Sequence, residues 1–144
     1  MSAANRLMTP VDNCYGGEIG LGLFYLLIGG ALGTLSRFLV SGWAHKLMGS
    51  NFPYGTLIIN TSGCFLIGFI GTTADEGSLL SSNFRLLILI GFLGAFTTFS
   101  TFAYESWLLL KDGEVLKMWF NLGGSLLFGV VAVILGVFLA RNML

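Results

Sequence analysis

The sequence contains few ionisable side chains. Of its 144 residues only 10% are charged, seven basic and seven acidic, and there is one histidine, His45. A soluble domain of ordinary composition is about 25% charged. A chain this poor in charge and 55% hydrophobic is therefore expected to lie in a lipid bilayer. Its formal net charge of zero gives no indication of binding to nucleic acid.

Residues suited to metal binding or catalysis are equally scarce. Cys14, Cys64 and His45 are too few to form a soft-ligand metal site, and we interpret both cysteines as ordinary thiols. Glu105 is the one carboxylate inside an apolar segment, whereas general acid–base catalysis usually needs more than one positioned group. The sequence therefore does not predict an enzyme.

Four apolar segments are long enough to cross a membrane. We place them at about residues 19–43, 54–72, 84–110 and 118–140, after a polar tail at residues 1–18 that lacks a signal-peptide pattern. The prediction is one all-α integral membrane domain, residues 19–144, with four transmembrane helices. In the first segment, Gly29 and Gly33 form a GxxxG pair suited to close helix contact.

The third segment contains an unusually polar stretch, GFLGAFTTFSTFAYE, at residues 91–105. As one straight helix the segment would reach about 40 Å, beyond the hydrocarbon core of about 30 Å. A tilt could absorb this excess, but an internal break would do so as well, and Gly94, directly before the polar run, can loosen a helix. Non-helical backbone at membrane depth is tolerated only where protein or a water-filled cavity covers it. We therefore predict a broken third helix and a functional site at the break.

Two other segments carry polar or small residues at a spacing of four, which places them on one helix face. They are Thr56, Asn60, Cys64 and Gly68 in the second segment, and Asn121, Ser125 and Gly129 in the fourth. One such stripe can be explained as polar contact between helices, worth about 0.6 kcal/mol per bond. Two stripes and the Thr/Ser run favour a narrow hydrated path, whose amide and hydroxyl donors suit a small anion.

Aromatic and ionisable residues allow two interpretations each. Phe99 and Phe102 could simply pack, or could turn their positive ring edges to an anion. Arg37 could extend to the lipid headgroups or attract an anion into a vestibule. Glu105 could anchor a hydroxyl or couple protons.

The positive charges are evenly divided between the two sides of a four-span protein. Arg6, Arg85 and Arg141 fall on one side, and Lys46, Lys111 and Lys117 on the other. Because the imbalance of Lys and Arg sets orientation, the chain could insert both ways and two copies could pair antiparallel. The alternative is that other features fix one orientation.

Three motifs together resemble the Fluc (CrcB-type) family of fluoride channels. They are GFLGAFTTFSTFAYE at 91–105, GALGTLSRF at 30–38 and GTLIINTSGCFLIG at 55–68, and the resemblance covers about residues 20–141. It implies an antiparallel dual-topology homodimer with two fluoride pores. It also implies passive export of fluoride through a multi-pass protein of the bacterial plasma (inner) membrane.

The resemblance also implies roles for single residues. Phe99 and Phe102 would touch the permeating fluoride, and Asn60 would be the pore asparagine, with Thr56 one turn away. Ser125 and Gly129 fall on the family's polar track, and Asn121 takes a track position where some members carry Tyr. Glu105 matches a glutamate near the Phe pair, and Arg37 a vestibule arginine. A structural Na⁺ at the dimer interface would be held by the backbone carbonyls of Gly94 and Thr97; unwound carbonyls in membranes do coordinate Na⁺.

Two other functions are considered. A small proton-coupled multidrug exporter of the four-helix, dual-topology kind should carry a carboxylate in the centre of its first helix, where this sequence has only Arg37. A membrane scaffold that transports nothing is the third possibility.

Overall fold

The computed structural model describes residues 19–76 and 81–144, and every regular element within these ranges is helical. The polar tail predicted at residues 1–18, with Cys14 and Arg6, lies outside the described residues. The elements are α2 (Ile19–Met48), α3 (Tyr54–Glu76), α4 (Ser82–Arg85), η1 (Leu86–Leu93), α5 (Gly94–Phe96), α6 (Phe99–Lys111) and α7 (Val115–Met143).

Four stretches of the described chain are long and apolar enough to cross a membrane. They are Gly20–Met48, Tyr54–Glu76, Ser82–Lys111 and Val115–Met143. The prediction of an all-α protein with four membrane helices is confirmed. Helices extend past the expected spans, for example to Met48 and Glu76, because helical hydrogen bonding continues into polar residues beyond an apolar run.

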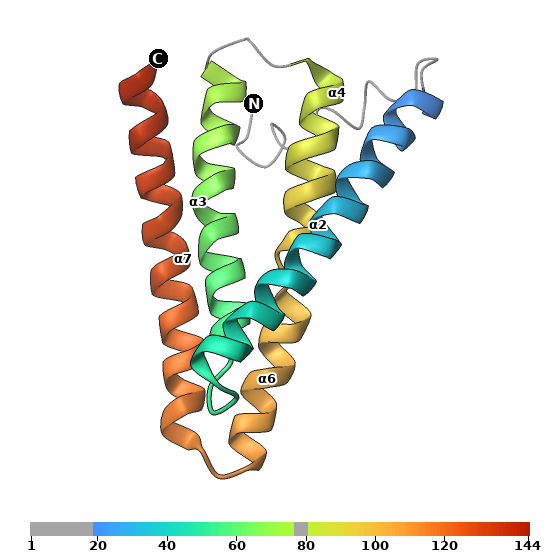
Figure 1. The fold of residues 1–144 in the computed structure, drawn as a ribbon. Coiled ribbons are helices and arrows are strands. Elements are labelled where there is room, and N and C mark those ends of the chain that lie inside the picture. The colour runs from blue at the N-terminus through green and yellow to red at the C-terminus, as the bar shows by residue number, and fades with distance from the viewer. Residues whose placement is uncertain (1–18, 77–80) are drawn as a thin grey trace.

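The helices form a bundle in which one member diverges (Figure 1). α3 and α7 run side by side, and α4, η1, α5 and α6 follow one another as a third column. α2 crosses this column at an angle. A small core of Ala74, Leu89 and Leu93 lies between α3 and the third column, with Leu66, Ile67, Ile70 and Phe92 packed around it.

Glycines bring two pairs of backbones into direct contact. A Cβ added to Gly29 would collide with the carbonyl oxygen of Leu87, and one added to Gly33 with that of Phe92. The predicted GxxxG contact is therefore confirmed, and its partner is η1. A second close contact joins α3 to α7, where a Cβ on Gly136 would collide with the carbonyl oxygen of Phe65. Both contacts fix the helices that surround the polar residues.

Two residues between α5 and α6 have extended backbone. Thr97 has φ/ψ of −77°/156° and Thr98 of −150°/113°, whereas Gly94 is helical at −63°/−35°. The Thr98 hydroxyl accepts a hydrogen bond from the Thr101 amide and so caps α6. An N-cap threonine of this kind stabilises a helix start by about 1 kcal/mol.

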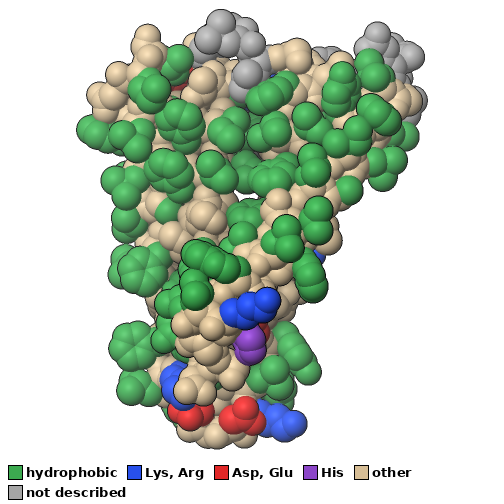
Figure 2. Space-filling model, in the orientation of Figure 1, with side chains coloured by type: hydrophobic (Ala, Val, Ile, Leu, Met, Phe, Trp, Pro, Cys, Tyr) green, Lys and Arg blue, Asp and Glu red, His purple; other side chains and the backbone are tan. Residues whose placement is uncertain are grey.

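Large apolar side chains cover the outside of the molecule. Figure 2 shows them along most of one face, with charged side chains gathered at its lower end. Leu27, Phe38 and Leu126 are among the most exposed. In water this exposure would be unfavourable, but in a bilayer these faces meet lipid tails or another apolar surface.

Candidate functional site

The Asn60 side chain binds both backbone groups of an extended residue. Its Nδ2 donates to the Thr98 carbonyl oxygen at 3.0 Å, and its Oδ1 accepts from the Thr98 amide at 2.8 Å. Thr98 is buried and non-helical, so its amide would otherwise lack a helical partner. Asn60 thus joins α3 to the interruption between α5 and α6.

This pairing and the Thr98 cap together leave two carbonyls of the third column without their helical amides. In a continuous helix each amide donates to the carbonyl four residues before it. Here the Thr98 amide donates to Asn60 rather than to Gly94, and the Thr101 amide donates to the Thr98 hydroxyl rather than to Thr97. The oxygens of Gly94 and Thr97, the two residues predicted to hold Na⁺, are therefore free of these helical bonds. Oxygen donors of this kind fit a hard cation.

A hollow of about 310 Å³ lies beside the interruption. Four of the predicted site residues line it, namely Asn60, Gly94, Thr97 and Phe99, together with Thr98, Gly63, Cys64, Ile67, Leu89 and Leu93. Gly63 is needed here because a Cβ at this position would collide with the Thr97 methyl group. The hollow combines amide and hydroxyl groups with an apolar wall.

Phenylalanine recurs at every third residue of this stretch, at Phe96, Phe99 and Phe102. The three rings have different surroundings. Phe96 is buried and stacks on Phe92, with ring centroids 5.7 Å apart. Phe99, which is 79% exposed, and the half-buried Phe102 form a tilted pair at 5.8 Å. The interruption at Thr97 and Thr98 separates the packing ring from the other two.

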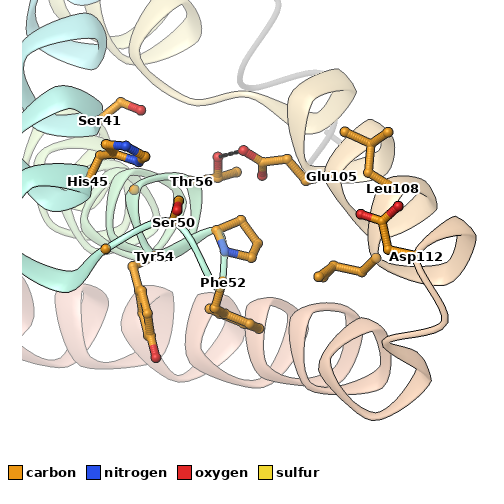
Figure 3. Close-up of a pocket in the computed structure, with 13 residues that line it drawn as sticks. Ser41, His45, Ser50, Phe52, Tyr54, Thr56, Glu105, Leu108 and Asp112 are labelled. Atoms are coloured by element: carbon orange, nitrogen blue, oxygen red, sulfur yellow. Dashed lines mark hydrogen bonds between the residues drawn. The ribbon is translucent and has the colours of Figure 1, made fainter.

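A second cavity, of about 330 Å³, lies at the loop end of α2 and α3 (Figure 3). Inside it the hydroxyl of Thr56, which is buried, donates to Glu105 Oε1 at 2.9 Å. Within residues 19–76 and 81–144, Glu105 Oε2 is buried without a hydrogen-bond partner. The interpretation of Glu105 as the partner of a hydroxyl is confirmed, and its second oxygen remains open to another donor.

Sequence reasoning missed several residues of this cavity. Ser41 and His45 of α2 line it, with Tyr54 and Asp112. The half-buried Arg37 precedes Ser41 by four residues and therefore shares its helix face. The spacing of four residues from Arg37 to Ser41 and from Ser41 to His45 is the sequence feature that could have predicted these two cavity residues. Arg37 lies further from the loop end of α2 than Ser41 and His45, the two residues of this helix that line the cavity.

The predicted stripe on α7 faces α6 and α3. Asn121 has no exposed surface, and its Nδ2 donates to Ser106 Oγ at 2.9 Å. Ser106 in turn donates to the Phe102 carbonyl at 2.8 Å. Ser106 is buried and was not predicted, because the sequence does not show that α6 and α7 pair at this point. Two successive hydrogen bonds therefore link the Asn121 side chain to the backbone carbonyl of Phe102.

The rest of the stripe contacts α3 or lies in the interior. A Cβ added to Gly129 would lie 3.4 Å from Cys64 Sγ, so these stripe members of α7 and α3 face each other. Ser125 Oγ is buried, and the part of the chain that the structure describes offers it no hydrogen-bond partner. Cys64 is a free thiol.

Comparison with known proteins agrees with these sequence motifs. The family described as "CrcB-like protein, Camphor Resistance (CrcB)" matches residues 24–137, which is most of the chain. The chain belongs to the CrcB-like family. The predicted family resemblance is thereby confirmed, and the match spans all four helices of this CrcB-like chain.

Curated relatives carry one functional name. The chain is 45% identical over 121 residues to "Fluoride-specific ion channel FluC" of Syntrophotalea carbinolica, which covers 84% of this chain and 98% of the relative. It is 46% identical over 114 residues to the protein of that name in Nitrosococcus oceani, at 79% and 91% coverage. These relatives are named as channels and not as enzymes.

One relative is longer. The protein with the same name from Methylococcus capsulatus is 42% identical over 125 residues, which is 87% of this chain but 55% of the relative. The chain thus spans about half the length of that relative and nearly the whole of the other two.

Proposed function

We propose that this chain is a fluoride-selective passive channel that exports fluoride across the bacterial plasma membrane and lowers its cytoplasmic concentration. The names of the relatives support fluoride as the ion. The observation that carries the proposal is the hollow beside the interruption, where the Asn60 amide and the exposed Phe99 ring line one space. A neutral N–H donor and a positive ring edge attract an anion without holding it as tightly as a buried cation would.

The proposed path uses the other predicted residues in sequence. Arg37 supplies a positive charge that raises the local concentration of anions in a vestibule. Asn60, Phe99 and Phe102 then replace part of the water around the ion. The amide of Asn121 and the hydroxyl of Ser125 continue the path as donors. Thr56 lies beside the path with its hydroxyl hydrogen donated to Glu105, and the absence of a side chain at Gly129 leaves room.

We further propose that two copies pair antiparallel, giving two pores and a central structural Na⁺. Gly94 is exposed and nothing lies within 4 Å of the position of an added Cβ, so a second copy can approach it. The released oxygens of Gly94 and Thr97 in each copy would then hold the cation. Its role is to supply a fixed positive charge that joins the copies, and it does not permeate.

The even division of Lys and Arg between the two sides supports the dual topology. A single cysteine in the loop between α6 and α7, introduced after Cys14 and Cys64 have been replaced by serine, tests it in whole cells. A membrane-impermeant reagent should label about half of the population from outside. Labelling of all or none of the protein would contradict insertion in both orientations.

The channel function is tested by anion efflux from liposomes that contain the purified protein. Wild-type protein should release fluoride and retain chloride. Phe99→Ile should lower fluoride flux by about two- to ten-fold, since an aromatic contact is worth about 0.5–1.5 kcal/mol. Phe138→Ile, a change of the same size at an exposed position of α7, should leave it unchanged. Equal flux of both anions, or unaltered flux in Phe99→Ile, would refute the assignment.

A further inference from the structure

Two acidic side chains line the cavity at the loop end of α2 and α3 without a positively charged partner. They are Glu105 and Asp112, which share this space of about 330 Å³ (Figure 3). Within residues 19–76 and 81–144 every other acid forms an ion pair: Asp75 with Arg85, Glu76 with Arg141 and Glu114 with Lys117. Because an unpaired carboxylate attracts positive charge, the cavity is suited to a cation.

The two carboxylates stand at opposite ends of the cavity wall that α6 provides. Glu105 and Asp112 are seven positions apart, which is nearly two helical turns. They therefore share one face of the helix at a separation of about 10.5 Å along its axis. Glu105 is half-buried and marks the inner end, whereas Asp112 is exposed and marks the mouth. The half-buried Leu108 and Leu109 line the cavity between them.

This spacing does not suit a metal ion. A cation such as Mg²⁺ or Ca²⁺ holds its oxygen ligands at about 2.0–2.6 Å, so one ion cannot contact carboxylates that are two turns apart. In the described part of the chain, no group of three or more His, Cys, Asp and Glu side chains could hold a metal ion. A single ligand for both carboxylates must itself carry two positive charges with an apolar chain between them.

The inner end of the cavity offers further acceptors to an ammonium group, which has three N–H donors. The Glu105 carboxylate accepts one hydrogen bond, from Thr56 at 2.9 Å, and keeps lone pairs for others. Ser41 and His45 line the cavity from the α2 side (Figure 3), and a hydroxyl or a neutral imidazole can also accept. A positive charge beside Glu105 favours the ionised form of its carboxyl group.

We infer that this cavity binds a linear organic dication of the α,ω-diamine class. One ammonium lies beside Glu105, the methylene chain lies along Leu108 and Leu109, and the second ammonium lies beside Asp112. An extended chain advances about 1.2 Å per bond, so the nine bonds between the nitrogens of octamethylenediamine span about 11 Å. The cavity volume of about 330 Å³ falls within the range of small-molecule sites, about 300–1,000 Å³. The site is separate from fluoride transport and does not depend on it.

Titration calorimetry of the purified wild-type protein in detergent, without fluoride, tests the site through the length and charge of the ligand. Octamethylenediamine should bind more than about ten-fold more tightly than ethylenediamine, which is too short to reach both carboxylates and covers less of the apolar wall. It should bind about three- to five-fold more tightly than the amino alcohol of the same chain length, which carries one charge and loses the exposed pair at the mouth.

Asp112→Asn tests where the ligand lies. This exposed position tolerates the change, and the variant should bind octamethylenediamine about three- to five-fold more weakly. The amino alcohol should keep its affinity, because it makes no ion pair at the mouth. The matched control is Glu114→Gln, which alters an acid of the same loop that is paired with Lys117 at 3.0 Å and does not line the cavity. It should leave both affinities unchanged.

Each result decides for or against the site. Failure of octamethylenediamine to bind overturns it, and so does equal affinity for all three ligands. Diamine binding that Asp112→Asn leaves unaltered, or that Glu114→Gln weakens to the same extent, would place the ligand elsewhere. Heat from MgCl₂ without heat from octamethylenediamine would show that the cavity takes a metal ion instead. The proposed channel is tested separately, by fluoride efflux, and none of these titrations depends on it.

Discussion

Asn60 and Asn121 occupy neighbouring helices and differ in how firmly their amides are held. Asn60 donates to and accepts from the backbone of Thr98, whereas Asn121 makes one bond, to the hydroxyl of Ser106. A backbone N–H can only donate and a carbonyl can only accept, so the Asn60 amide has a single possible orientation. A hydroxyl does both, so the Asn121 amide has two. The chemistry of the partner, more than burial, decides which asparagine can turn.

The largest expected effect is on stability at the interruption. Asn60→Ala leaves the amide of buried Thr98 without its partner and removes one hydrogen bond to its carbonyl, which should lower the free energy of unfolding by about 2–4 kcal/mol. Asn121→Ala loses one bond and should cost about 1–2 kcal/mol by the same reasoning. Thermal unfolding of both variants in one detergent measures the difference, with exposed Asn142→Ala as control. A greater loss in Asn121→Ala would reverse the comparison.

The smallest expected effect concerns a serine that is buried without a partner. Ser125→Ala removes a hydroxyl that is unbonded within the described residues, so stability should stay the same or rise by up to about 1 kcal/mol, while fluoride flux falls. In Ser62→Ala, by contrast, a hydroxyl bonded to the Ile58 carbonyl at 2.7 Å is lost, and stability should fall by about 0.5–1.5 kcal/mol. Both are read from thermal unfolding and efflux. A clear loss of stability in Ser125→Ala would show that its hydroxyl is bonded after all.

The sequence was sufficient to predict the helices and several of their contacts. Apolar length gave the four spans, and the spacing of Gly29 and Gly33 gave a close contact, which the structure places against Leu87 and Phe92. The spacing of four in Thr56 and Asn60 gave a shared face, and both side chains bond to residues of the third column. These features depend on local periodicity, which a single sequence contains.

Other features depend on which helices meet, and a single sequence does not contain that information. Gly94 drew attention as the point where a helix could loosen, yet it is helical, and the extended residues are Thr97 and Thr98. Their backbone is held by Asn60, which lies far away in the chain. Ser106 was missed for the same reason, since its role appears only when α6 lies against Asn121.

The hydrogen bond from Asn60 to the Thr98 carbonyl limits how many hydrogens the Asn60 amide can donate to an anion. An asparagine NH₂ group has two hydrogens, and one of them is committed to that carbonyl. An anion beside Asn60 therefore receives a single hydrogen from this residue. The rest of its coordination must come from retained water or from the edge of the exposed Phe99 ring, so an ion at this point is only partly dehydrated by amide donors. Because the carbonyl of Thr98 at the interruption takes one hydrogen of the Asn60 amide, the interruption limits how many amide hydrogen bonds the protein can offer to an ion at this point.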